Sequence, residues 1–142
     1  MKITIGLPML LLALVAMACQ QKPIQQKVTP PSGAIATAEA AQHVGEVQTV
    51  YGTVASARYV YWTRGQPTFL NLDEPHPHQV FTIVIWNLTR ERFGFAPEER
   101  FLDKAVCVTG LIEEEEGIPR IVVKELSQIQ ILKPSRPGQP QS

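Results

Sequence analysis

The longest strand candidate in this 142-residue chain is EVQTVYGTVASARYV, from Glu46 to Val60. Valine, threonine and tyrosine, which favour strands, recur along it. Its glycine, Gly52, lies in the interior of the stretch. An interior glycine often marks a bulge or a sharp bend at the corner of a small barrel. The stretch therefore predicts one long, bent first strand.

Shorter segments on both sides of this strand complete the order of elements. The other strand candidates share apolar patterning and lie at residues 68–72, 79–86, 104–113 and 120–132, the last as one strand bent around Ser127. A short helix is expected at 37–45, with Thr37 as N-cap and Gly45 at the left-handed C-terminal position. A second is expected at 96–102, where Pro97 suits the first helical position. Three strands, a short helix and two strands predict an all-β fold, the five-stranded OB-fold barrel.

Several motifs add a resemblance to this pattern. They are Gly65-Gln66-Pro67-Thr68-Phe69-Leu70-Asn71-Leu72, Phe81-Thr82-Ile83-Val84-Ile85-Trp86 and Cys107-Val108-Thr109-Gly110. Over residues 37–132 the chain resembles bacterial OB-fold domains of the tRNA-anticodon-binding type that occur in exported proteins. The resemblance implies nucleic-acid binding. Some of these relatives carry a cysteine where this chain has Tyr51, so any pairing of that cysteine with a counterpart of Cys107 is absent here.

The first nineteen residues read as an export signal. Lys2 gives a positive start, an apolar run follows to Ala18, and small residues lead to Cys19. This order is typical of a signal peptide, here residues 1–18, and the run is short for a membrane span. The segment before Cys19 resembles a lipobox, although Ala16 stands where leucine is commonest. We expect Cys19 to carry acyl chains; the alternative is a secreted protein with a free N-terminal thiol.

The predicted anchor places the chain in the cell envelope. Gln20 after the cysteine resembles the sorting signal of diderm lipoproteins that are placed in the outer membrane, facing the periplasm. Residues 19–35 read as a flexible tether, residues 36–132 as the OB-fold domain, and the proline-rich residues 133–142 as a disordered tail. Between residues 45 and 132 there are 8 Lys/Arg and 12 Asp/Glu, a net charge of −4. This charge disfavours generic nucleic-acid binding, which gains from neutralising phosphates.

The candidate ligand-binding residues follow from where OB-folds bind, the face of strands 2 and 3 and the adjoining loops. Aromatic rings there can stack on bases, and arginines can pair with phosphates. The expected binding residues are Arg58, Tyr59, Tyr61, Trp62, Arg64, Phe69 and Asn71. The structural alternative for Tyr59 and Trp62 is that they close one end of the barrel.

Other notable groups are read as structural. The four glutamates at 113–116 are interpreted as a solvated hairpin tip or as a patch for a basic partner. His76 and His78 could chelate a metal, but their prolines fit an ordinary loop, so no metal is expected. Cys107 lies in an apolar strand and is expected to be buried and inert. We find no catalytic motif, and neither an enzymatic activity nor a cofactor is expected.

Two functions therefore remain open from the sequence. The first is a membrane-anchored OB-fold module that binds single-stranded nucleic acid or another oligomer, as the resemblance implies. The second is a protein-interaction or envelope-assembly module without nucleic-acid binding, in which the acidic hairpin attracts its partner. Fold alone does not decide between them.

Overall fold

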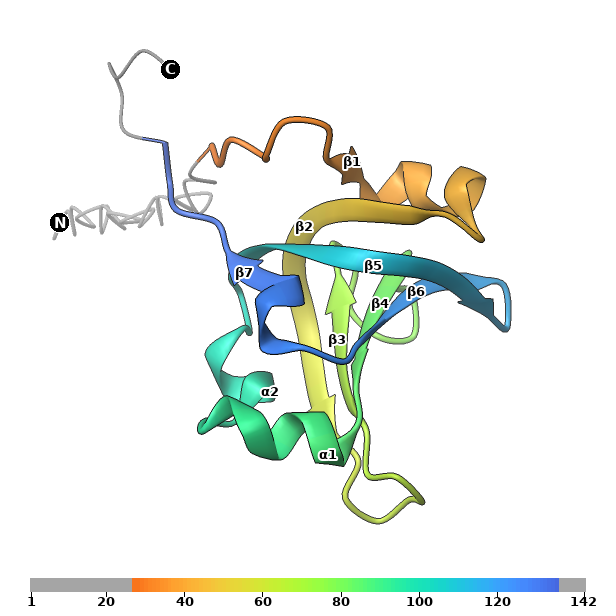
Figure 1. Ribbon diagram of the computed structural model, residues 1–142, viewed down its shortest axis with the longest axis vertical. Coiled ribbons are helices and arrows are strands. Elements are labelled where there is room, and N and C mark those ends of the chain that lie inside the picture. The colour runs from red at the N-terminus through yellow and green to blue at the C-terminus, as the bar shows by residue number, and fades with distance from the viewer. Residues whose placement is uncertain (1–26, 136–142) are drawn as a thin grey trace, which may run out of the picture.

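The computed structural model describes residues 27–135. The predicted signal peptide, the predicted lipid acceptor Cys19 and most of the predicted tail lie outside these residues. No helix within 27–135 is long and apolar enough to cross a membrane. Figure 1 shows a barrel of strands with short helices at its ends.

The closed barrel is made by β2 (Val47–Tyr59), β3 (Thr68–Leu72), β4 (Phe81–Ile85), β5 (Ala105–Glu115) and β6 (Ile118–Val123). Neighbouring strands pair in the order β2-β3-β4-β6-β5, and β5 returns to β2. The β4–β6 pair is parallel and the others are antiparallel. The predicted OB-fold is confirmed, because this is its five-stranded barrel.

The long first strand makes closure possible by pairing on both sides of the barrel. Its first half, Val47–Thr53, pairs with β5, and its second half pairs with β3 from Val54 onward. The register shifts between Val54 and Ser56, which is the irregularity that lets one strand serve both sheets. The shift lies beyond Gly52, so the expectation of a bulge at that glycine was wrong, whereas the predicted barrel corner does lie next to it, where the partner changes from β5 at Thr53 to β3 at Val54.

At Gly52 the strand is instead approached closely by the side chains of two other segments. A Cβ atom at this position would lie 2.9 Å from Thr37 Cγ2 and 3.0 Å from Asp73 Oδ1. Both contacts are shorter than real Cβ atoms tolerate comfortably. Glycine is therefore required here for packing.

The core fills the barrel with the inward-facing residues of every strand. Leu70 and Leu72 of β3 and Phe81, Ile83 and Ile85 of β4 are fully buried. Residues that alternate with them point to the outer face, as the two-residue period of a strand requires. The same alternation in β6 buries Ile121 and Val123.

The helix before the barrel is a 3₁₀ helix, η1 (Thr37–His43), that places Ala40 in the core. Its N-cap is Ala36, one residue before the predicted Thr37, and the Ala36 N–H donates to the Glu39 carboxylate at 2.8 Å. The Thr37 hydroxyl instead donates to Asp73 from the β3–β4 loop. Gly45 has a φ of +89°, which confirms the left-handed position.

The segment between β4 and β5 contains more helix than predicted. The expected helix is α2 (Pro97–Arg100), with Pro97 at its start as predicted. Before it lie α1 (Asn87–Arg90) and η2 (Glu91–Phe93), which are too short to show an apolar period in the sequence. The rings of Phe93 and Phe101 enter the core and meet edge to face with their centroids 6.1 Å apart.

The expected fifth region is two strands and not one bent strand. β6 forms a hairpin with the second half of β5, whereas β7 (Ile129–Ile131) pairs with Val106–Val108 in its first half. The 3₁₀ turn η3 (Leu126–Gln128) separates them. The Gln128 side-chain oxygen accepts from the backbone N–H groups of Lys124 and Glu125, which fixes this turn.

The two ends of the described chain meet outside the barrel. Strand β1 (Ile35–Ala36) runs parallel to β2, and Val28 pairs with Pro134 in an isolated bridge. The Ser135 N–H also donates to the Lys27 carbonyl at 3.3 Å. The last part of the expected tether is thus paired with the first part of the expected tail.

Candidate ligand-binding face

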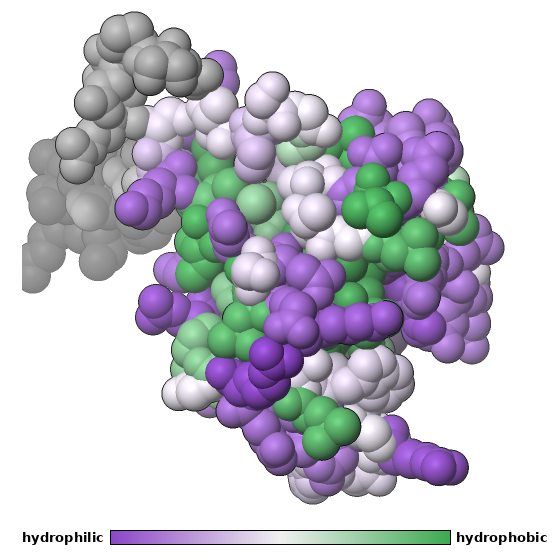
Figure 2. All heavy atoms as spheres, in the orientation of Figure 1, coloured by the Kyte–Doolittle hydropathy of each residue, from purple (hydrophilic) through white to green (hydrophobic). Residues whose placement is uncertain are grey.

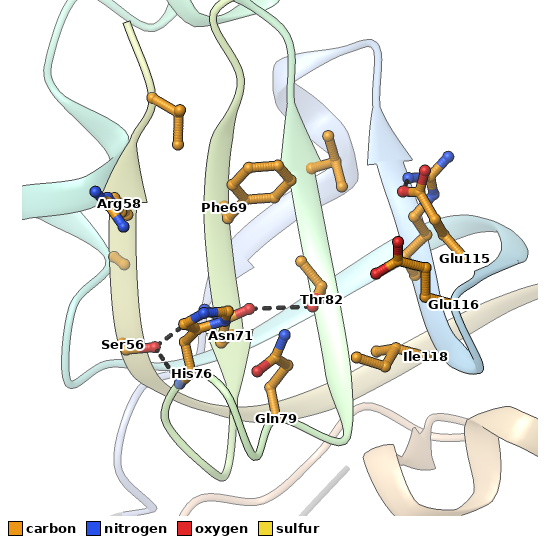
Figure 3. A pocket seen from close by; sticks show the side chains of 14 residues that line it. Ser56, Arg58, Phe69, Asn71, His76, Gln79, Thr82, Glu115, Glu116 and Ile118 are labelled. Atoms are coloured by element: carbon orange, nitrogen blue, oxygen red, sulfur yellow. Dashed lines mark hydrogen bonds and ion pairs between the residues drawn. The ribbon is translucent and has the colours of Figure 1, made fainter. Parts of the chain in front are cut away.

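A cavity of about 550 Å³ opens on the outer face of β2, β3 and β4. Figure 3 shows side chains from these three strands converging on it, with the β3–β4 loop at one end and the β5–β6 hairpin along one side. The sheet residues that line it are Ser56, Ala57, Arg58, Phe69, Asn71, Thr82 and Val84. This is the face on which OB-folds bind their ligands.

The floor of the cavity is a hydrogen-bonded row across three strands (Figure 3). The Thr82 hydroxyl donates to Asn71 Oδ1 at 3.1 Å, and Asn71 Nδ2 donates to Ser56 Oγ at 3.0 Å. The backbone N–H of His76, in the β3–β4 loop, donates to the same Ser56 oxygen at 3.0 Å. This row holds the loop against the sheet and fixes the shape of the floor.

These outward-facing side chains are unusually enclosed for a barrel surface. Asn71 is only 5% exposed, Thr82 8% and Val84 1%. Gln79 also lines the cavity, and its Oε1 is buried without a hydrogen-bond partner among the described residues. A buried polar atom without a partner is costly, which makes Gln79 available to a ligand.

The hairpin wall carries the acidic run found in the sequence. Arg120 of β6 lies 3.5 Å from Glu113 and also pairs with Glu115, so its positive charge is balanced by two carboxylates. Glu116, at the turn, lines the cavity and has no ion-pair partner among residues 27–135. All four glutamates are exposed, as expected for a solvated hairpin tip, and two of them also pair with Arg120.

The structure brings together three of the residues predicted to bind ligand. Arg58, Phe69 and Asn71 all line the cavity, from β2 and β3. The Arg58 guanidinium lies 4.8 Å from the centre of the Trp62 ring, which links the cavity to the loop after β2. Their role in binding stays a prediction.

The other four predicted residues do not line the cavity. Tyr59 points elsewhere, since its hydroxyl donates to Asn87 Oδ1 at 3.1 Å and Arg90 stacks on its ring at 3.9 Å. It fits the structural alternative of closing one end of the barrel. Tyr61, Trp62 and Arg64 are exposed on the loop after β2, with the first two rings edge to face at 5.0 Å.

Several lining residues were missed by sequence reasoning. They are Ser56, His76, Gln79, Thr82 and Arg120. Thr82 could have been found from strand alternation, which places it on the same face of the sheet as Asn71. The two residues lie opposite each other in the register of β3 and β4. The long-range pairing that places Arg120 beside the same face leaves no local trace in the sequence.

Three further groups outside the predicted binding set are an aspartate, two histidines and a cysteine. Asp73 Oδ1 accepts from the Thr53 N–H at 2.9 Å, so this carboxylate ties the β3–β4 loop to β2. His76 and His78 are exposed, and within residues 27–135 no three His, Cys, Asp or Glu side chains are grouped to hold a metal. Cys107 is buried as predicted, and burial raises the pKa of its thiol.

The apolar surface beside these features is scattered. Figure 2 shows apolar side chains in several separate groups among hydrophilic ones on the face turned to the viewer. Large exposed apolar residues elsewhere include Leu88, which is 82% exposed on α1. The cavity is thus distinguished by shape and polarity rather than by a large apolar patch.

Comparison with solved structures supports the fold. A structure assigned to an aspartyl-tRNA synthetase from Leishmania major Friedlin matches 80% of the chain at 17% identity and a TM-score of 0.51. An aspartyl-tRNA synthetase from Entamoeba histolytica matches 86% at 16% identity and a TM-score of 0.47. The chain spans about a quarter of each, 23% and 25%. No protein-family model and no curated protein matches the chain. The chain therefore has an OB-fold. This is shown by its strand pairing and by its structural similarity to the first of these proteins.

Proposed function

We propose that this chain is a non-catalytic OB-fold binding module that captures a segment of a protein partner in the β2–β3–β4 cavity. The observation that carries the proposal is the balance of charge around the cavity. The lining contains two arginines, Arg58 and Arg120, and two glutamates, Glu115 and Glu116. A polyanion gains little from such a site, because Arg120 is paired with glutamates, only Arg58 of the two lining arginines lacks a carboxylate partner within residues 27–135, and the unpaired Glu116 repels phosphate.

The chemistry of the lining supports binding rather than catalysis. Asn71 and Thr82 hydrogen-bond each other, and the described cavity residues form no pair of nucleophile and oriented base. Enclosed amide and hydroxyl groups beside a half-buried aromatic ring, Phe69, are the usual features of a recognition site. Their fixed hydrogen bonds hold the site in shape before the ligand arrives.

Membrane attachment is the second part of the proposal. Lipid on Cys19 would hold the barrel close to a membrane, with only residues 20–26 between the anchor and the described part of the chain. Acyl chains contribute about 0.8 kcal/mol per buried methylene, so several chains give lasting attachment. The partner would then be met at the envelope, on the periplasmic side of an outer membrane in a diderm cell.

A second candidate function, binding of single-stranded nucleic acid, has its own supporting observation. Arg58 stacks on Trp62, and Tyr61 lies beside it, which together offer a cation and two exposed rings. Stacking of a base on such rings is worth about 1–3 kcal/mol. The Leishmania neighbour is named for an enzyme that acts on tRNA, although the likeness itself concerns the fold.

The two candidates separate in one capture experiment. The chain from Cys19 to Ser142, carrying Cys19→Ser, is immobilised and exposed to envelope extract of the source bacterium, with and without nuclease. We expect a defined protein to be retained by this chain and by Leu88→Asp, but lost with Phe69→Asp. Leu88 is the matched control because it is exposed outside the cavity. Equal retention by both variants would contradict the proposal.

The nucleic-acid candidate is measured directly with labelled oligothymidylate and oligouridylate at low salt. Fluorescence anisotropy that rises with the chain and falls with Trp62→Ala would establish it. In that case nuclease would also abolish the retained material in the capture experiment.

A further inference from the structure

The hydrogen bonds of the cavity floor run in one direction, from β4 to β2. Thr82 donates to Asn71, and Asn71 donates to Ser56. Ser56 Oγ accepts a second hydrogen bond from the His76 N–H. Because this oxygen accepts twice, and its own O–H has no acceptor among the described residues, the Ser56 hydroxyl is left as a donor. The β2 wall therefore ends in a group that suits an oxygen acceptor on a ligand.

Arg58 adds positive charge to the same wall. It lies two residues after Ser56 on β2, so the two side chains share one face of the strand. Its guanidinium stacks on Trp62 and has no carboxylate partner among the described residues. Together these groups favour a carbonyl or carboxylate oxygen at the β2 wall.

The opposite wall, on the β5–β6 hairpin, has the reverse character. Glu115 is occupied by Arg120, but the carboxylate of Glu116 lines the cavity without a partner among residues 27–135. A carboxylate accepts hydrogen bonds and carries negative charge. This wall therefore favours an ammonium or guanidinium group.

The middle of the cavity suits a group with both a donor and an acceptor. Gln79 points between the two walls in Figure 3, and its amide makes no hydrogen bond within the described part of the chain. A side-chain amide offers one acceptor and two donors, and turning it over loses no existing bond here. Phe69, half-buried on β3 on the other side of the Asn71–Thr82 pair, supplies an apolar surface for an aliphatic stem (Figure 3).

We propose that the cavity binds an extended peptide segment through a basic side chain directed at Glu116 and backbone carbonyls at the Ser56–Arg58 wall. This assignment rests on the proposed function and names the chemistry of the captured segment. Val60 also lines the cavity at the start of the loop that carries Tyr61 and Trp62, so a longer segment continues onto those rings. A phosphate chain crossing the same path would pass the unpaired Glu116.

The test is a nuclear magnetic resonance titration of the ¹⁵N-labelled chain from Cys19 to Ser142 with Cys19→Ser. The probes are trilysine, triglutamine and triglutamate, each acetylated and amidated, and an octamer of thymidylate. We expect trilysine to shift the backbone signals of Asn71, Gln79 and Thr82, and to bind about fivefold more tightly than triglutamine. Triglutamate and the thymidylate octamer are expected to bind more weakly still.

Three variants make the assignment specific. Glu116→Gln should remove the preference for trilysine over triglutamine, whereas Glu114→Gln should leave it unchanged. Glu114 is the matched control because it belongs to the same acidic run but does not line the cavity. Ser56→Ala should weaken the binding of every peptide about fivefold, because it removes the hydroxyl donor. If this variant is less stable, the comparison of Glu116→Gln with Glu114→Gln still tests the assignment.

The outcomes separate this assignment from the proposed function. Equal affinity for all peptides, an equal effect of the two glutamate variants, or preferred binding of the thymidylate octamer would overturn the assignment of a basic segment. If partner capture by the wild-type chain still depended on Phe69 in that case, the proposed function would stand with a different segment chemistry. If neither the preference for trilysine nor the Phe69-dependent capture of a partner were observed, the proposed function would be overturned as well.

Discussion

Asn71 and Thr82 are joined by a hydrogen bond across β3 and β4 on the outside of the barrel, where both are more than nine-tenths buried. Polar pairs on an outer sheet face are ordinarily exposed to water. Here the β3–β4 loop and the β5–β6 hairpin flank the pair in the cavity. This enclosed polar row is what separates the binding face from the rest of the surface.

Thr82→Val tests how much the hydrogen-bonded row contributes to the stability of the domain. The substitution keeps the shape of the side chain but removes the donor to Asn71 Oδ1, leaving an enclosed oxygen unsatisfied. We expect a loss of about 1–3 kcal/mol in the free energy of unfolding, measured by urea denaturation. The double variant Asn71→Leu with Thr82→Val should recover part of that loss, because neither partner is then left unpaired. An unchanged stability in the single variant would show that the row is solvated.

Gly52→Ala tests the close packing behind the long strand. The new methyl group would meet Thr37 Cγ2 and the Asp73 carboxylate. We expect a destabilisation of about 1–3 kcal/mol, as for other overpacked sites, seen as a lower denaturation midpoint. Thr37→Ser removes the methyl group of the threonine and keeps its hydroxyl, so it should relieve part of the effect. Additive losses in the double variant would argue against this contact.

Cys107 provides a prediction about pH. Burial raises the pKa of its thiol, so the reactive thiolate stays rare in the folded chain as the pH approaches the ordinary thiol range. In a Cys19→Ser chain, we expect iodoacetamide to label Cys107 slowly up to about pH 8.5, and rapidly once urea unfolds the domain. Labelling at equal rates with and without urea would mean that the strand opens readily.

Cys19→Ala tests the membrane anchor independently of the barrel. If Cys19 carries the proposed acyl chains, the substitution removes their acceptor, and the chain should leave the membrane fraction when the variant is expressed in the source organism. Immunoblots of separated fractions measure this directly. A variant that stays with the membranes would show that something other than Cys19 holds it there.

The order of the barrel strands was predictable because the information is local. Apolar patterning predicted Thr68–Leu72 with its observed bounds, and the long run around Gly52 predicted β2. Short helices such as Asn87–Arg90 and the division between β6 and β7 were missed, because they are set by closure of the barrel and by the Gln128 side chain. Those are tertiary effects that override local propensity.

The lining of the cavity was predictable in part for the same reason. Arg58, Phe69 and Asn71 lie on strands and loops that the OB-fold assigns to its ligand. Ser56, Gln79 and Arg120 come from three separate segments that only the folded chain brings together. Tyr59 was included among the predicted binding residues for its aromatic ring. In the structure its ring contacts Arg90 and its hydroxyl donates to Asn87.

Photo-crosslinking inside the cell would show whether a protein partner occupies the β2–β3–β4 cavity. A benzophenone amino acid replaces Phe69 in the cavity and, in a separate chain, Leu88 outside it. We expect an adduct from position 69 alone that proteinase removes and nuclease leaves intact. Equal adducts from both positions, no adduct from position 69, or an adduct that nuclease removes would contradict the proposed function.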